Sequence, residues 1–177
     1  LGYVVAAMGN LPGAVEAYQA ARDTAERLPR IAPGNTRWQD GLSGCHDKEG
    51  TVLVAMGNLP GALKAHRAAL AILQHLVAGD PGNADWQHNL SNTRFHLGDA
   101  LVAKGNLPGA LESYRMGIAI AARLAQRDQG NALWQRTLAR GKKSFGRALA
   151  ARGDLTEAHR AHRPRSAWTG SRAPRPA

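Results

Sequence analysis

The chain has 177 residues, of which 44% are apolar but only 5% are aromatic, and it carries 23 basic and 13 acidic side chains. The single cysteine, Cys45, excludes an internal disulfide framework, and no apolar run approaches the roughly 18 residues of a membrane span. Ala and Leu dominate the apolar residues without a sustained strand-like alternation, so the composition predicts an all-α protein of the reducing cytoplasm. Because the chain begins with Leu1, we expect it to be a fragment or a processed product.

A repeat of 48 residues organises the chain. Trp38, Trp86 and Trp134 follow one another at this spacing, and the segments 35–82 and 83–130 share 22 identical residues over 48 positions without a gap. Such self-similarity indicates a helical repeat array over residues 1–162. The expected units are a partial one at 1–34, complete ones at 35–82 and 83–130, and a degenerate one at 131–162. Residues 163–177 are rich in Arg and Pro, and we expect them to form a disordered tail.

Each unit is predicted to contain two helices of similar length. In the third unit the turn at 80–83 ends on an asparagine that can cap a helix, and the apolar positions from Trp86 onward recur on one helical face until Gly105. Asn106 offers a second cap, Pro108 suits the first turn of the next helix, and that helix is expected to end near Gln126. Two helices of equal length favour an antiparallel hairpin.

The residues at fixed places in the unit resemble those of the tetratricopeptide repeat family. The third unit shows the family's order of marks in Leu97-Gly98, Leu101, Gly105, Ala110 and Tyr114. The unit departs from the family's roughly 34-residue length and lacks the proline that closes the second helix, so it is similar to a longer-helix variant. The resemblance implies helical hairpins stacked into a right-handed superhelical solenoid. It also implies a protein–protein interaction scaffold that has no catalytic centre and no cofactor.

The resemblance further implies a concave groove lined by the first helix of each unit, in which a peptide or partner segment lies. Apolar contacts are expected at Phe95 and Val102, and a stripe of cations at Arg140, Lys143 and Arg147 is expected to orient an acidic partner. An ordinary solvated basic face is the alternative explanation of the stripe. The lining residues carried over from the family are Gly44, Asp47, Thr51 and Val54, then Asn92, Phe95, His96, Asp99 and Val102, and finally Arg140, Lys143, Ser144 and Arg147.

Charge supports a second possible function, the binding of nucleic acid or another polyanion. Residues 97–144 hold eight basic and three acidic side chains and residues 145–177 hold seven and two, whereas the first 96 residues are balanced. A metal site is not expected, because His66 and His162 occupy the place of Tyr18 and Tyr114 and are better explained by packing. Cys45 is expected to be an inert thiol, and the three repeated Trp residues are expected to fill the interfaces between units.

Overall fold

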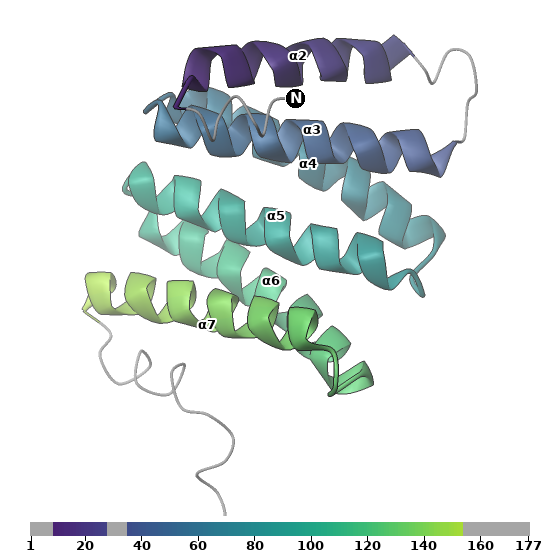
Figure 1. Ribbon diagram of the computed structural model, residues 1–177. Coiled ribbons are helices and arrows are strands. Elements are labelled where there is room, and N and C mark those ends of the chain that lie inside the picture. The colour runs from purple at the N-terminus through teal and green to yellow at the C-terminus, as the bar shows by residue number, and fades with distance from the viewer. Residues whose placement is uncertain (1–8, 28–34, 154–177) are drawn as a thin grey trace, which may run out of the picture.

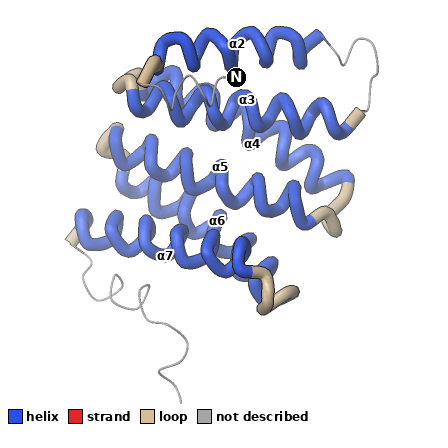
Figure 2. Tube along the Cα trace, in the orientation of Figure 1, coloured by secondary structure: helices blue, strands red, loops and turns tan. Residues whose placement is uncertain are grey.

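The computed structural model describes residues 9–27 and 35–153, and every regular element in these ranges is an α-helix (Figures 1 and 2). Within them, no helix combines the length and apolar character that a bilayer crossing requires. The expected tail at 163–177 and the second half of the last unit lie outside the described residues. The helices are α2 (Leu11–Arg27), α3 (Thr36–Ala55), α4 (Leu59–Gly79), α5 (Ala84–Ala103), α6 (Leu107–Arg127) and α7 (Ala132–Arg152).

The turns between the helices lie where the sequence predicts them. Gly57 and Gly105 end their helices with positive φ angles of 77° and 81°, in the left-handed region that glycine enters without a steric penalty. A proline follows in the first turn of α4 and of α6. An asparagine side chain caps the start of every helix from α3 to α7 by accepting a hydrogen bond from a backbone N–H of the first turn. The capping residues are Asn35, Asn58, Asn83, Asn106 and Asn131.

The 48-residue repeat of the sequence is also the repeat of the structure. The helices α3, α5 and α7 begin at residues 36, 84 and 132, and α4 and α6 begin at 59 and 107. Each helix packs against the next one in the chain, and α3 also contacts α5, which in turn contacts α7. The described residues therefore form antiparallel helical hairpins stacked into a solenoid, as the purple-to-green progression of Figure 1 shows.

Within each hairpin, an aromatic ring from the second helix rests on a glycine of the first. A Cβ atom at Gly98 would lie 2.5 Å from Cε1 of Tyr114, and a Cβ atom at Gly50 would lie 2.7 Å from Cε1 of His66. Both distances are shorter than any normal carbon–carbon contact, so only glycine allows the helices to approach this closely. The spacing between the repeated glycine and the repeated ring thus has a direct steric cause.

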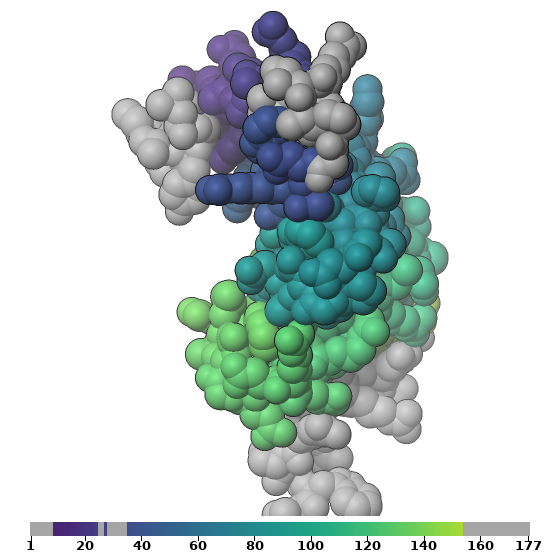
Figure 3. All heavy atoms as spheres, turned by 90° about the vertical axis from the view of Figure 1, so that its right-hand side faces the viewer, coloured from purple at the N-terminus to yellow at the C-terminus, as the bar shows by residue number. Residues whose placement is uncertain are grey.

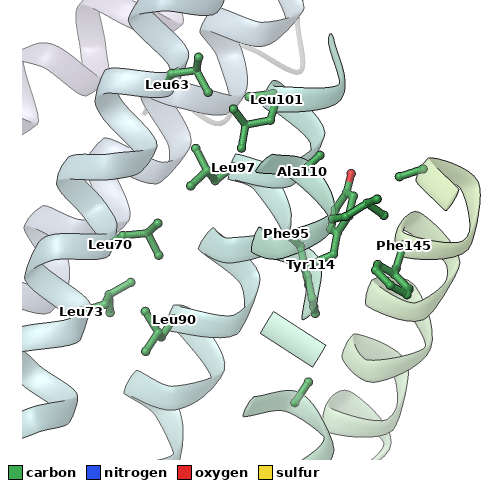
Figure 4. Close-up of a cluster of buried hydrophobic side chains, with 14 of the residues drawn as sticks. Leu63, Leu70, Leu73, Leu90, Phe95, Leu97, Leu101, Ala110, Tyr114 and Phe145 are labelled. Carbon is green, nitrogen blue, oxygen red and sulfur yellow. The ribbon is translucent and has the colours of Figure 1, made fainter. Parts of the chain in front are cut away.

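Leucine side chains join successive hairpins into one core. Figure 4 shows Leu70 and Leu73 on α4 directed toward Leu90 on α5, and all three are buried. On the other side of α5, Tyr114 and Phe145 belong to the same cluster. Burial of such side chains contributes about 1.5 to 3 kcal/mol each, which makes this continuous core the main source of stability.

Phe95 lies in this core and not in the groove, which corrects the sequence-based expectation that its ring contacts a partner. The side chain is 1% exposed and is wedged between α6 and α7. A Cβ atom at Gly117 or at Gly141 would overlap the ring. One repeat earlier in the sequence, Ala69 and Thr93 stand at the places of these two glycines, and Asp47 stands at the place of Phe95. The smaller residues on α6 and α7 thus make room for the ring on α5.

The repeated Trp residues are less buried than expected. Trp38, Trp86 and Trp134 all stand in the first turn of their helices and are half-buried. Trp86 packs against the edge of the leucine-rich core. The Trp residues therefore lie at the ends of the hairpins and not at the centre of the interfaces between them.

Candidate functional site

The first helices of the units form the inner side of the solenoid. Along this side α5 directly contacts both α3 and α7, whereas α4 and α6 on the opposite side are not in comparable contact. A stack whose elements are closer on one side than on the other curves toward the closer side. Figure 3 shows this face as a hollow, with α5 recessed between α3 and α7. The structure thus supports the expectation that the first helices line the concave surface.

A pocket of about 310 Å³ opens on the concave face where α3, α5 and α7 meet. Its volume is at the lower end of the range of small-ligand and side-chain sites in proteins. Most of the lining side chains are polar, and two of them, Lys48 and Arg140, are cationic. The lining residues are Ser43, Gly44, Asp47, Lys48, Leu73, Asn89, Asn92, Thr93, His96 and Arg140.

The carboxylate of Asp47 forms the floor of this pocket and joins three helices. It accepts hydrogen bonds from Nδ1 of His66 on α4 at 3.1 Å and from Nδ1 of His96 on α5 at 2.9 Å. Burial by itself would raise the pKa of Asp47, but the two hydrogen bonds and the charge of the histidines outweigh it and hold the pKa well below its usual range. Asp47 is therefore ionised at every physiological pH.

The guanidinium group of Arg140 is held in place above the pocket by α5. It donates a 2.6 Å hydrogen bond to Oδ1 of Asn92, lies 3.4 Å from Nε2 of His96, and stands 5.6 Å from the centroid of the Phe95 ring. The buried Phe95 thus contributes to the site as a platform for a cation. Of the three cations predicted on α7, Arg140 is the one with a defined orientation.

Asn92 is itself oriented by His88. The Asn92 amide N–H donates to Nε2 of His88 at 3.0 Å, and the Thr137 hydroxyl of α7 lies within hydrogen-bond distance of the same nitrogen, at 3.0 Å. Burial, together with the charge of Arg140, lowers the pKa of His88, which keeps its ring neutral and able to accept. The chain His88–Asn92–Arg140 therefore fixes the amide oxygen toward the arginine.

Three side-chain pairs between successive first helices have the same spacing. Asp40 accepts from Asn89 at 3.2 Å, Asp47 accepts from His96, and His88 pairs with Thr137, and each pair is 49 positions apart. Each of these side chains thus pairs one residue beyond its own repeat-equivalent position in the neighbouring unit. Polar ladders along the concave face, and not apolar contacts, set the register there.

The pocket gathers five of the residues predicted to line the groove and leaves the others outside. Gly44, Asp47, Asn92, His96 and Arg140 line it together. Among the predicted residues outside the pocket, five are exposed: Thr51, Asp99, Val102, Lys143 and Arg147. The half-buried ones are Val54 and Ser144. Asp99 is exposed and accepts a 2.6 Å hydrogen bond from the Tyr114 hydroxyl, so its carboxylate is partly committed to the hairpin.

Several pocket residues were missed by the sequence analysis. Lys48 and Asn89 stand one helical turn from predicted positions on the same face, and Lys48 occupies the place of His96 in the repeat. Projecting every exposed position of the first helix, and not only those around the Leu-Gly pair, would have found both. His88 and Thr137 had no recognisable signal, because their pairing depends on the one-residue offset between units.

Cys45 is half-buried on α3 and is not part of the pocket lining. Burial, and to a smaller extent the charge of Glu49, raises the pKa of its thiol, so the sulfur is protonated at neutral pH. Within 9–27 and 35–153, His, Cys, Asp and Glu side chains form no group of three arranged to hold a metal ion.

No family model matches the chain, and no curated protein matches it. Among solved structures, the chain is similar to the crystal structure of MamA, with a TM-score of 0.34 and 18% identity over 92% of this chain and 90% of that chain. It is also similar to BtubC (BKLC) from P. vanneervenii, with a TM-score of 0.43 and 17% identity over 100% of this chain and 82% of that chain. These likenesses are distant, and the helical-repeat fold is defined by the chain's own helices.

Proposed function

We propose that the protein is a non-catalytic interaction scaffold that binds an acidic segment of a protein partner on its concave face. The observation that carries the proposal is the charge of α7, which contains six basic and no acidic side chains and borders the pocket. A cluster of like charges is unfavourable unless an opposite charge offsets it. An acidic ligand supplies that charge.

The arrangement of the cations supports a built site over a merely solvated surface. Arg140 is pre-oriented by Asn92 and the Phe95 ring, so little side-chain entropy is lost when its remaining N–H groups bind a carboxylate. Lys143 and Arg147 are exposed and have no acidic partner among the described residues. A partner carboxylate can therefore bind them without displacing an ion pair.

Apolar contact is available beside the cations. Val102 on α5 is 37% exposed, whereas Leu90, Leu97 and Leu101 of the same helix are buried. With Phe95 in the core, Val102 takes over as the apolar contact for a partner segment. An acidic peptide with one aliphatic residue fits this combination best.

We also propose that the array is a longer-helix relative of the tetratricopeptide repeat. The packing of Tyr114 on Gly98 and of His66 on Gly50 supports this relation, because it gives a structural role to the residues that carry the resemblance. The proposal accounts for the concave placement of the first helices. It implies nothing about the identity of the partner.

Removing two cations from either face of the solenoid tests the binding proposal. The variant Lys143→Gln with Arg147→Gln removes two concave cations, and Lys64→Gln with Arg67→Gln removes two exposed cations from α4 on the opposite side. Fluorescence anisotropy with a short glutamate-rich peptide should show about tenfold weaker binding for the first variant and nearly unchanged binding for the second. Equal affinities of the two variants, or no binding by the parent, would contradict the proposal.

Nucleic-acid binding is the competing function, and the same two variants separate it. Long-range phosphate attraction depends on total charge and on salt, so binding to a DNA duplex should weaken in both variants and fall steeply with ionic strength. If the duplex binds more tightly than the peptide and responds equally to both variants, the polyanion alternative is favoured.

A further inference from the structure

We infer that binding of an anion in the concave pocket is coupled to uptake of one proton from solvent by His96. The inference rests on the proposed function, since it describes how the same pocket is regulated. It is carried by the hydrogen-bond geometry of the two imidazole nitrogens. These nitrogens face groups of opposite character.

The Nδ1 atom of His96 is a donor. It lies 2.9 Å from Oδ2 and 3.1 Å from Oδ1 of Asp47, and a carboxylate that is ionised can only accept. The carboxylate is ionised because its pKa is held low. Nδ1 therefore carries its hydrogen in the free protein.

The Nε2 atom of His96 is an acceptor in the same arrangement. It lies 3.4 Å from Nη1 of Arg140, and a guanidinium group has N–H donors only. A proton on Nε2 would place two donors face to face. The geometry of the free pocket thus matches an imidazole that donates from Nδ1 to Asp47 and accepts at Nε2 from Arg140.

The charges around His96 come from three neighbouring helices and oppose one another. Asp47 on α3 attracts a positive charge on the imidazole, whereas Lys48 on α3 and Arg140 on α7 repel it. The His66 ring on α4 lies 5.9 Å away and shares the carboxylate, and from α6 no ionisable side chain hydrogen-bonds to His96 in the described part of the chain. An anion bound beside Arg140 adds a negative charge on the side of the imidazole that faces the cations.

His66 is not the group that takes the proton. Its Nε2 atom is buried and has no hydrogen-bond partner among the described residues, and the ring is fully enclosed against Gly50. A proton there would create a buried donor with no acceptor, which is unfavourable, and more so for a charged group. His96 has a side chain that is 21% exposed and lines the pocket.

Protonation of His96 converts the pocket from an internally paired state into an anion receptor. The new Nε2–H group becomes a donor toward the pocket, and the N–H of Arg140 that pointed at Nε2 becomes available to the same ligand. A carboxylate or phosphate oxygen accepts from both and offsets the added charge. Anion and proton therefore bind together, and each favours the other.

The test measures protons directly. Titration calorimetry of the glutamate-rich peptide, in buffers of different ionisation enthalpy near neutral pH, gives the number of protons taken up per peptide bound. The parent protein should take up a substantial fraction of one proton and should bind about fivefold more tightly near pH 5.5 than near pH 8, the range in which histidines change charge.

The variant His96→Asn isolates the effect, because an asparagine amide can still donate to Asp47 but does not titrate. Proton uptake should vanish in this variant and persist in His75→Asn, which changes an exposed histidine of α4. The proton resonances of the parent's His96, followed by NMR with and without peptide, supply a readout that needs no variant.

Four results would overturn the inference. If the peptide binds without proton uptake, or if uptake persists in His96→Asn, the coupling is absent while the proposed function stands. If the His96 resonances titrate identically with and without bound peptide, the coupling is likewise absent. If the peptide does not bind at any pH between about 5.5 and 8, the inference fails together with the proposed function.

Discussion

Asp47 on α3 and His96 on α5 lie 49 positions apart in the sequence, and Nδ1 of the imidazole donates a 2.9 Å hydrogen bond to the carboxylate. The repeat-equivalent of Asp47 in the next unit is Phe95, and that of His66 is Tyr114. The interface between the second and third units thus contains a buried carboxylate–histidine cluster at a place where the following interface has aromatic rings. The same repeat position therefore holds a carboxylate at one interface and an aromatic ring at the next.

Replacing Asp47 with Asn should destabilise the protein by about 2 to 3 kcal/mol, because one amide oxygen cannot accept from both histidines and one buried N–H loses its acceptor. Urea denaturation followed by circular dichroism measures the change. The matched variant Asp99→Asn alters an exposed carboxylate and should cost less than about 1 kcal/mol. Equal losses in the two variants would mean that the buried cluster contributes no more than a surface charge.

The contribution of Asp47 should depend on pH in a defined direction. Its folded-state pKa is lower than the ordinary value of about 4, so below that pH the unfolded chain binds a proton that the folded chain does not. The stability gap between the parent and Asp47→Asn should therefore be full at neutral pH and narrow as the pH falls below about 4. A gap that widens in acid would contradict this assignment.

Tyr114 offers a second pH-dependent test, at the alkaline end. Burial, reinforced by the hydrogen bond to Asp99, raises the pKa of its hydroxyl above the ordinary value of about 10. Above that pH the unfolded chain releases a proton that the folded chain keeps, so this part of the stability is present below about pH 10 and is lost as the pH rises.

The variant Tyr114→Phe keeps the ring on Gly98 but removes the hydroxyl. It should cost about 1 kcal/mol at neutral pH and should flatten the alkaline decline. Denaturant titrations from neutral pH upward compare the two proteins. Parallel alkaline profiles would show that Tyr114 does not cause the decline.

Two glycines of first helices should respond oppositely to the same substitution. Gly141→Ala forces a Cβ atom into the Phe95 ring and should destabilise by about 1 to 3 kcal/mol, whereas Gly41→Ala adds a methyl group in open space on α3 and should stabilise by about 0.5 to 1 kcal/mol. Adding Phe95→Leu should recover part of the loss in Gly141→Ala. Thermal and urea unfolding measure all three, and a harmless Gly141→Ala would refute the close packing of Phe95.

The repeat length, the helix pairs and the turns were predictable because each depends on local signals. Asn83 and Asn106 cap helices because their side chains accept hydrogen bonds from nearby backbone N–H groups, and Gly105 ends a helix because glycine adopts a positive φ easily. The 48-residue repeat places the same residues at equivalent positions in other units. The half-exposure of Trp86 was not predictable in this way. It depends on how far the neighbouring hairpin extends over the first turn of α5, which no single unit encodes.

The candidate site was predictable as a face but not as a set of contacts. Family resemblance placed Asn92, His96 and Arg140 on one side of the solenoid, and the structure brings them into one pocket. The burial of Phe95 escaped prediction because it requires two glycines on two other helices to coincide around one ring. Contacts of this kind form only when neighbouring units stack, so they cannot be read from the sequence of one repeat.

NMR mapping of the glutamate-rich peptide on the isotope-labelled protein shows directly where the peptide binds. If the concave face is the binding surface, amide shifts should concentrate on α3, α5 and α7 around Lys48, Asn92, Arg140 and Lys143, and α4 and α6 should change little. Shifts concentrated on the exposed positions of α4 and α6, or spread evenly over every basic residue, would contradict the account.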